Sequence, residues 1–350
     1  MNIFSFISEF AGLSKNALAI DLGTVNTLIA MHGSGVVLFE ATAVAVAEDD
    51  ESIVLAVGNE AVEMCGRTPS GVVLRYPFKD GVIADYKLAE YMIHDFFHKA
   101  IRKALKHGLY SSPRVLLCVP SCVTDVERRA VCEAVRHAGA KEVLVADEIM
   151  AACVGSGLPY SEAVGSMVVD IGGGTSDAAV IVLGGIAVSK SIRSGGNNAD
   201  KCIISYIRKS NNLVVGTRTA ERVKKQLSAE KKPEFIEVSG LNLETGLPKS
   251  IKLSVKELTQ SLSECIDEIV ALVRNVLSIT PPELAADIMK SGITLCGGGA
   301  YLSGLREAIK VSTGLNVHMS KKPLECVALG AMELLDQMKQ SSAQSAVVNY

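Results

Sequence analysis

The segment from Val168 to Ile181 reads VVDIGGGTSDAAVI and constrains the fold more than any other stretch of the chain. Apolar residues lead into an aspartate, three glycines, two hydroxyl residues and a second aspartate, and then an apolar run resumes. The apolar stretches predict two strands joined by a glycine turn. Glycine within a sheet costs stability unless another backbone or a ligand must come close. The turn therefore indicates such a close approach.

A second segment, LAIDLGTVNTLIAM at residues 18–31, has the same plan of strand, aspartate, glycine turn, hydroxyl residue and strand. The two segments lie about 150 residues apart, so we expect equivalent hairpins in two similar domains. Facing each other across a cleft, the turns would offer backbone N–H groups and hydroxyls to an anion. Asp21 and Asp170 would repel phosphate, which indicates a hydrated Mg²⁺ between them. Two ordinary glycine-rich hairpins without a ligand are the alternative.

The length and composition fit a two-domain globular protein. A chain of 350 residues exceeds what one core usually organises, and 48% apolar with 21% charged residues is globular composition. A net charge of −3, with no long basic block, gives no general attraction to nucleic acid. The nine cysteines form no C-x-x-C pair, which favours buried thiols in the cytoplasm over disulfides or a zinc site.

The hydrophobic pattern along the chain predicts alternating strands and helices in two blocks, which is typical of α/β domains. Predicted helices cover residues 85–107, 124–138, 198–209, 217–228, 254–278 and 281–290. The segment 142–158 is predicted to begin as a strand and to continue as a helix of small residues. The chain contains no G-x-x-x-x-G-K-[ST], and neither GGGTSD nor GGGAYL completes G-x-G-x-x-G, which excludes P-loop NTPases and Rossmann dehydrogenases.

Together with GGGAYLSGL at residues 297–305, the two hairpins resemble the actin, heat-shock chaperone and sugar kinase superfamily of ATPases. The segments RYPFKDGVIADY, VERRAV, GTRTAERVK and TPPELAADIM resemble the MreB branch of bacterial actins, in order and at similar spacing. The resemblance implies an actin-like ATPase fold, with two RNase H-like domains flanking a cleft for ATP and Mg²⁺. It implies one domain from residues 1–149 plus 324–350 and a second from residues 150–323.

The resemblance also assigns site residues. Residues of both turns and of three later segments would bind the nucleotide: Leu22, Gly23, Thr24, Asn26, Gly172, Gly173, Gly174, Thr175, Gly196, Glu221, Lys224, Gly297, Gly298, Gly299 and Ala300. Asp21 and Asp170 would serve the metal. The glycines at 297–299 would leave room for a flat base. For Glu221 and Lys224, a solvated helix face is the alternative to a role at the adenosine.

The resemblance places catalysis at Glu148, which would orient the water that attacks the γ-phosphate, with the hydroxyls of Thr175 and Ser176 beside it. Asp147 would tune the charge of its neighbour. Without the resemblance, an acidic pair at a helix start is more often a partner of the helix dipole.

The chain departs from the MreB pattern at several positions. Ile149 stands where a proline usually follows the glutamate, and Ser176 replaces a threonine. Asn197 and Asn198 stand where the branch usually has two acids. Two fewer negative charges near the nucleotide affect metal handling or hydrolysis rate, so the resemblance supports ATP binding more firmly than rapid hydrolysis.

The function implied is a self-assembling filament, built of paired protofilaments, that organises cell shape and cell-wall synthesis at the inner face of the membrane. A small-molecule kinase or a chaperone-like ATPase using the same cleft is the alternative. Membrane contact would involve residues 2–10 and the pair Leu109 and Tyr110. In MNIFSFISEFAG the apolar side chains fall on one helical face, which predicts either an interfacial membrane helix or a terminal segment that docks on the protein itself.

Overall fold

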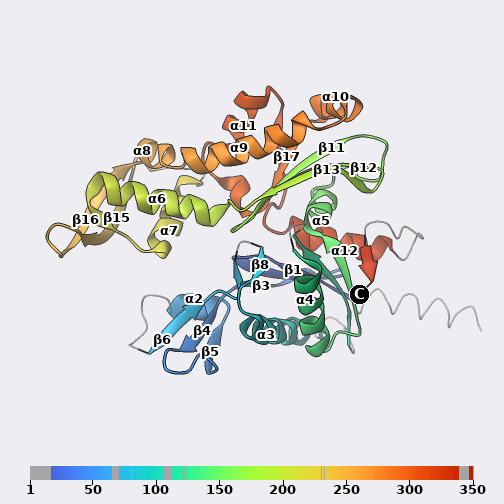
Figure 1. Cartoon of the computed structure of the whole chain (residues 1–350), viewed down its shortest axis with the longest axis horizontal. Helices are drawn as coiled ribbons and strands as arrows, with labels where there is room; N and C mark the ends of the chain where they lie inside the picture. The colour runs from blue at the N-terminus through green and yellow to red at the C-terminus, as the bar shows by residue number, and fades with distance from the viewer. Residues whose placement is uncertain are drawn as a thin grey trace, which may run out of the picture.

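The computed structural model describes residues 17–64, 71–79, 81–105, 112–120, 123–229, 231, 233–338 and 347–349. Two large sheets dominate it (Figure 1). The first has the strand order β19-β10-β9-β1-β2-β3. Its strands are β1 (Ala17–Leu22), β2 (Asn26–Met31), β3 (Gly35–Ala41), β9 (Arg114–Val119), β10 (Glu142–Asp147) and β19 (Val347–Asn349).

The second sheet has the strand order β13-β12-β11-β17-β18. Its strands are β11 (Ser166–Ile171), β12 (Ser176–Val182), β13 (Gly185–Ile192), β17 (Ile293–Cys296) and β18 (Val317–Met319). In each sheet the first three strands of the chain run antiparallel and the next two add in parallel. The β1–β2 and β11–β12 hairpins therefore occupy equivalent places, as the repeated sequence plan predicted.

Two helices, α5 (Glu148–Gly155) and α12 (Cys326–Gln337), form a layer between the sheets. They share one hydrophobic cluster with side chains from both sheets, including Leu116 of β9 and Val168 of β11. The helices cross in backbone contact, because a Cβ atom on Gly330 would overlap the carbonyl oxygen of Ala151. A Cβ atom on Gly155 would likewise overlap the carbonyl oxygen of Cys326. Glycine is therefore required on both helices.

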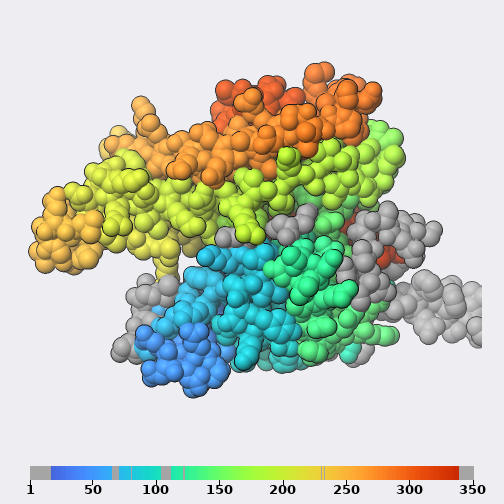
Figure 2. Space-filling view, viewed as in Figure 1, coloured from blue at the N-terminus to red at the C-terminus, as the bar shows by residue number. Residues whose placement is uncertain are grey.

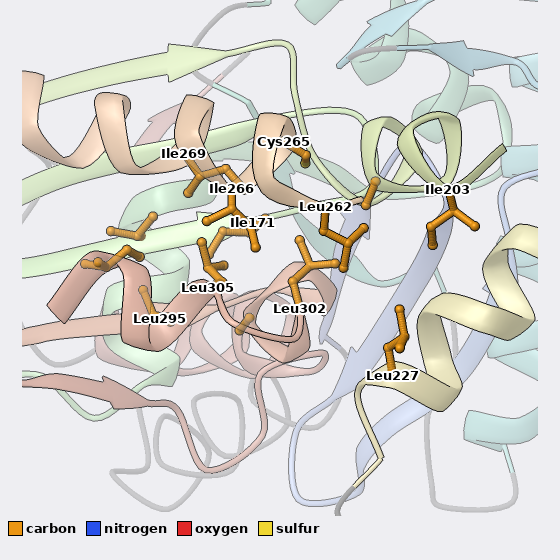
Figure 3. Packing of buried hydrophobic residues seen from close by; sticks show 14 of the residues in the cluster. Ile171, Ile203, Leu227, Leu262, Cys265, Ile266, Ile269, Leu295, Leu302 and Leu305 are labelled. Atoms are coloured by element: carbon orange, nitrogen blue, oxygen red, sulfur yellow. The ribbon is translucent and has the colours of Figure 1, made fainter. Parts of the chain in front are cut away.

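Longer helices cover the outer faces. In the first half, α3 (Tyr86–Leu105) and α4 (Asp125–His137) pack their apolar sides on β1 and its neighbours, with Phe96 and Phe97 fully buried. In the second half, α9 (Ser263–Ser278) and α11 (Leu305–Thr313) enclose a core of aliphatic side chains (Figure 3). This half also contains α6 (Gly196–Asn211), α10 (Pro282–Ser291) and the short 3-10 helix η1 (Gly298–Tyr301).

Each half carries a smaller projection on the same side of the molecule (Figure 1). The first comprises β4 (Val44–Ala47), β5 (Val54–Val57), α2 (Asn59–Met64) and β6 (Val72–Arg75), and the separate short hairpin of β7 (Phe78–Lys79) and β8 (Val82–Ile83) follows it in the chain. The second comprises β14 (Leu213–Val214), α7 (Thr217–Leu227), β15 (Phe235–Asn242), β16 (Pro248–Ser254) and α8 (Val255–Gln260). In the space-filling view the two halves appear as two lobes in contact (Figure 2).

Most predicted helices are present, but the single helix expected over residues 254–278 is wrong. The structure contains α8 and α9 with a break at Ser261 and Leu262. The Ser261 hydroxyl donates to the carbonyl of Leu258, and Leu262 N–H donates three residues back to Thr259. The Ser261 N–H still donates four residues back to Glu257, so the three-residue bond of Leu262 marks the point at which the regular helical pattern is interrupted. Among the described helices, none combines the length and the apolar character that crossing a bilayer requires.

Candidate functional site

The two glycine turns meet between the halves of the molecule. A Cβ atom on Gly173 in the second turn would overlap the Val25 side chain of the first turn. The turns are therefore in van der Waals contact, and the second can approach the first only because residue 173 has no side chain. This close approach explains why the second turn has a glycine at position 173.

The second turn rests on the start of α6. The N–H groups of Gly196 and Asn197 donate to the carbonyl oxygens of Gly172 and Gly173 at 3.0 and 2.8 Å. The described residues contain no cis peptide, and in a trans peptide the N–H points opposite to the carbonyl. The N–H groups of Gly173 and Gly174 therefore point away from α6. They form a pair of amide donors of the kind that binds anions.

The first turn is held by Thr42, which follows β3. Its hydroxyl donates to the Gly23 carbonyl at 2.7 Å, and its N–H donates to the Val25 carbonyl at 2.8 Å. The same peptide geometry turns the Thr24 N–H away from Thr42. The Thr24 hydroxyl accepts the Gly81 N–H at 3.2 Å, so this side chain ties the turn to the β7–β8 hairpin. Thr42 was not identified from the sequence.

The predicted metal residues, Asp21 and Asp170, lie near the ends of β1 and β11 and are 8% and 4% exposed. Burial raises the pKa of Asp21 to about 7. Burial also raises the pKa of Asp170 to about 8, with further increases from the charges of Asp21 and Asp177. The two carboxyl groups are therefore brought into electrostatic contact from opposite halves, and both disfavour the ionised state.

Further acids converge on the same place. Burial raises the pKa of the Cys118 thiol well above its usual value, and four carboxylates raise it further: Asp21, Glu148, Asp147 and Asp170. Asp177, on β12, directly opposes Asp170 in the hairpin register. Burial raises its pKa to about 6, the Ser191 hydroxyl that it accepts lowers it, and the charge of Asp147 raises it. The site therefore gathers carboxyl groups from both halves, and their closeness opposes ionisation of all of them at once.

Asp177 was not assigned a role from the sequence, although it is the second aspartate of VVDIGGGTSDAAVI. Pairing of the two strands about the turn would have placed it opposite Asp170. That signal was present in the sequence.

These residues fit Mg²⁺ better than a transition metal. The Oδ1 atom of Asp170 is buried without a hydrogen-bond partner, so a hydrated cation would supply the interaction that it lacks. Mg²⁺ uses one or two carboxylates and keeps several waters. The described residues contain no group of three or more His, Cys, Asp or Glu side chains arranged to hold a metal directly. This arrangement suits a hydrated ion shared with a phosphate.

Glu148 is the first residue of α5, directly after Asp147 ends β10. Both side chains are partly exposed, whereas Ile149 is 1% exposed and packs in the layer between the sheets. The carboxylates thus lie at the carboxyl edge of the first sheet, beside the turns. Ser176, predicted beside them, is fully buried, and its hydroxyl donates to the Ser194 carbonyl at 2.6 Å. Thr175 is 7% exposed and lies within the turn.

The predicted adenosine segments surround the second turn. Lys224 of α7 donates to Asp200 and to the Gly196 carbonyl, both at 2.8 Å, so its ammonium group binds the first turns of α6. Asp200 was not identified from the sequence. Glu221 pairs with Lys225 at 2.7 Å on the exposed side of α7.

The GGG segment also contacts the second hairpin. Gly297 has a φ of +75°, and a Cβ atom on it would overlap the carboxylate of Asp170. A Cβ atom on Gly299 would overlap the Ile171 side chain, and one on Gly298 would lie 3.1 Å from Leu324. Close packing on β11 therefore explains two of these glycines without reference to a base. Ala300 follows them in η1 and is 6% exposed.

The two asparagines that depart from the MreB pattern lie in the first turn of α6. The Asn198 amide donates to the Ser194 hydroxyl at 3.0 Å and to the Glu268 carboxylate at 2.9 Å. An acid at this position would repel Glu268. The predicted membrane residues 2–10, Leu109 and Tyr110 lie outside the described residues.

Comparison with known proteins agrees with this architecture. Cell shape-determining protein MreB of Escherichia coli (strain K12) is 44% identical over 339 residues, covering 94% of this chain and 97% of that protein. Cell shape-determining protein Mbl of Bacillus subtilis (strain 168) is 41% identical over 324 residues, covering 92% and 96%.

Two solved structures share the fold. The crystal structure of MreB5 of Spiroplasma citri bound to ADP has a TM-score of 0.85 and 34% identity, covering 93% of this chain and 97% of that one. A MamK double helical filament has a TM-score of 0.75 at 21% identity, covering 92% and 99%, which supports the actin-like fold alone. The family model described as MreB/Mbl protein matches residues 15–343. The chain therefore belongs to the MreB/Mbl family of bacterial actin homologues.

Proposed function

We propose that this protein binds ATP with Mg²⁺ between its two hairpins and assembles into filaments that organise cell shape. The observation that carries the nucleotide proposal is the contact between the Val25 and Gly173 turns over two buried aspartates. Its relatives support the rest. MreB5 of Spiroplasma citri was solved with ADP and with AMPPNP, MamK was solved as a double helical filament, and the MreB and Mbl relatives are cell shape-determining proteins.

In this proposal the turns bind the phosphates. The N–H groups of Gly173 and Gly174 and the N–H of Thr24 approach from opposite halves. The amino end of α6 lies directly behind the second turn, and its partial positive charge favours an anion there. Asp21 and Asp170 hold the water shell of Mg²⁺, which when bound neutralises phosphate charge.

Hydrolysis rests on Glu148. Its carboxylate lies at the start of α5, among the acids that surround Cys118, and would orient the attacking water. Asp147 adjusts the local charge. Because the Ser176 hydroxyl is committed to Ser194, we assign it to holding the second turn in place and leave the hydroxyl beside the γ-phosphate to Thr175.

We further propose that residues 1–149 with 324–350 and residues 150–323 act as two units, which move about the crossing of α5 and α12. The sheet composition supports this division, because β19 pairs with β10 of the first sheet. Domain closure around bound nucleotide would then control assembly.

Membrane attachment is a separate part of the proposal. Residues 2–10 and the pair Leu109 and Tyr110 would give each subunit two weak anchors, which add together in a polymer. Proteins of cell-wall synthesis would then be organised from the inner face of the membrane. Deleting residues 2–10 together with Leu109→Ser and Tyr110→Ser should abolish co-sedimentation of filaments with liposomes. Unchanged co-sedimentation would refute this attachment.

Sedimentation and light scattering test the main proposal. With Mg²⁺ present, ATP should move the protein into the pellet and raise scattering, whereas samples without nucleotide should remain in the supernatant. Absence of ATP-dependent assembly under all salt conditions tried, together with sugar-stimulated release of ADP, would instead favour a small-molecule kinase.

A further inference from the structure

Two histidines face each other on the outer surface of α3, remote from the hairpin turns. His94 and His98 are one helical turn apart, and their Nε2 atoms are 3.1 Å from each other. The ring centroids are 4.3 Å apart with the planes at 64°. Both side chains are exposed, while Phe96 and Phe97 between them point into the core. α3 lies on the side of the first sheet opposite α5 and α12 (Figure 1).

The pair lies in an open surface depression that its own helix provides. The lining residues are Tyr91, His94, Asp95, His98, Ile101 and Arg102. Asp95 forms an ion pair with Lys99 at 2.8 Å. Partial burial lowers the pKa of His98, as do the positive charges of His94 and Arg102, whereas Asp95 raises it. Neutral imidazole is the form that coordinates a metal.

The spacing of the two nitrogens matches a chelate. Zinc binds imidazole nitrogen at about 2.0–2.1 Å, so two nitrogens that subtend an angle between square and tetrahedral are about 2.9–3.3 Å apart. The observed 3.1 Å falls inside this interval. We propose that His94 and His98 form a two-nitrogen binding site for a divalent transition-metal ion, Zn²⁺ in particular, with water in the remaining positions.

Without a metal, the two histidines are joined by a hydrogen bond between their Nε2 atoms. One Nε2–H donates to the other Nε2, and this hydrogen bond also has a normal length at 3.1 Å. When the ion binds, both rings carry their single proton on Nδ1, so both Nε2 lone pairs face the metal. A neutral pair changes tautomer and releases no proton.

The chemistry of this site differs from that of the cleft. Imidazole suits zinc, nickel and copper, whereas carboxylate and water suit magnesium. The described residues place no third His, Cys, Asp or Glu in a ligating arrangement with this pair, so the site stays open to water. Two ligands predict affinity that rises from nickel to copper and falls again at zinc, with no binding of Mg²⁺.

Calorimetric titration of the full chain with Zn²⁺, in excess Mg²⁺ and without nucleotide, tests the site. Wild type should bind one ion per chain. His94→Gln and His98→Gln should each weaken this binding by about 10²-fold, because each removes the chelate. His137→Gln is the matched control, since this exposed histidine pairs with Glu90 at 2.9 Å and should leave zinc affinity unchanged.

A register shift provides the rescue. Adding Arg102→His to His94→Gln creates a new pair with His98, four residues apart on the same helix, and should restore binding. Electron paramagnetic resonance with Cu²⁺ should detect two coupled nitrogens in the wild type and one in either single variant. The proposal is overturned if the double variant His94→Gln/His98→Gln binds zinc as wild type does, or if wild type shows no stoichiometric binding.

Discussion

The two hairpins are built alike down to individual neighbours. In the first, Asp21 of β1 lies beside Cys118 of the parallel strand β9. In the second, Asp170 of β11 lies beside Cys296 of the parallel strand β17. A buried hydroxyl follows each turn and bonds to the segment after the third strand: Thr27 to Thr42 at 2.9 Å, and Ser176 to the Ser194 carbonyl at 2.6 Å.

The hairpins differ in charge and in the element that the chain forms after the third strand. Opposite Asp21, the register places Leu28, whereas Asp170 faces the second acid, Asp177. After its third strand the first hairpin continues into β4, but the second continues into α6, whose first N–H groups bind the turn. The scaffold is thus repeated while the electrostatics are not. We therefore expect the second hairpin to dominate binding of metal and phosphate.

Replacing the two aspartates should give the largest effect and tests this asymmetry directly. Asp170→Asn should reduce affinity for Mg²⁺-ATP by about 10²-fold or more, because it removes the carboxylate whose Oδ1 has no protein partner. Asp21→Asn should reduce the affinity for Mg²⁺-ATP by about tenfold, which is the lower end of the range for groups that orient a metal. Calorimetry with Mg²⁺-ATP measures both. Equal losses would show that the two hairpins contribute alike.

Glu148→Ala should slow ATP hydrolysis by roughly 10–1000-fold while leaving ATP affinity and thermal stability nearly unchanged. Filaments should still assemble, since assembly would depend on closure and not on cleavage, and they should turn over more slowly. Phosphate release and scattering recovery measure the two rates. Asp147→Ala is the control with the smaller expected effect, because in the proposed mechanism this residue adjusts the local charge and does not orient the water. A larger effect of Asp147→Ala would reassign the water-orienting group.

Gly173→Ala tests the contact between the turns. The added methyl group would overlap Val25, so we expect a loss of about 2 kcal/mol in the free energy of unfolding, and weaker nucleotide binding. Adding Val25→Gly to Gly173→Ala should restore most of the lost free energy of unfolding. Val25→Ala should restore less, because the Val25 Cβ would still lie 2.8 Å from the new methyl group.

Gly185→Ala is the matched control, since the nearest atom to its added methyl group would be the Val182 carbonyl oxygen at 3.8 Å. Urea unfolding measures all four variants. If Gly173→Ala and Gly185→Ala have the same small effect on the free energy of unfolding, the two turns separate easily. Their contact then does not fix the position of one half relative to the other.

The hairpins and the long helices were predictable from the sequence because their signals are local. Apolar runs around an aspartate and glycines define strand and turn, and Thr124 with Glu127 forms the capping box at which α4 begins. The boundary between α8 and α9 was not predictable in this way. The apolar pattern continues across it, and the break is visible in the hydrogen bonds at Ser261 and Leu262.

Other features depend on tertiary contacts that no local pattern encodes. The strands β15 and β16 were not predicted. Most of their residues are exposed, and few buried side chains, such as Val238, mark the alternation of a strand in the sequence. Ser176 resembles a phosphate-facing hydroxyl in the sequence, yet the return of the chain after β13 brings the Ser194 carbonyl to it. Whether the predicted site residues bind nucleotide stays a prediction.

The pH dependence of stability should distinguish the two aspartates in the protein without nucleotide. Their pKa values rise from 3.8 to about 7 for Asp21 and about 8 for Asp170. Between the pKa of the unfolded chain and the higher pKa of the native chain, each aspartate is ionised when unfolded but still protonated when folded. The free energy of unfolding therefore falls as pH rises from about 4 to 8. We expect both groups to contribute to this loss, with Asp170 acting over the wider pH interval.

Asp170→Asn should flatten this profile and make the protein more stable than wild type at pH 8, although it binds Mg²⁺-ATP less well. Asp21→Asn should flatten it less, and only up to about pH 7. Urea titrations at a series of pH values provide the measurement. A wild-type stability that rises over this interval would mean that the carboxylates are stabilised as anions in the fold.

The smallest expected difference concerns the two buried hydroxyls. The Thr42 hydroxyl donates to the Gly23 carbonyl, so in the Thr27–Thr42 bond Thr27 is the donor and Thr42 keeps its own bond when Thr27 is replaced. Thr27→Val should therefore cost about 0.5 kcal/mol, whereas Ser176→Ala takes the donor from the Ser194 carbonyl and should cost about 1–2 kcal/mol. Urea unfolding measures both. If Ser176→Ala leaves stability intact but slows hydrolysis, its hydroxyl turns toward the nucleotide in the working protein, and the second hairpin differs from the first in this residue as well.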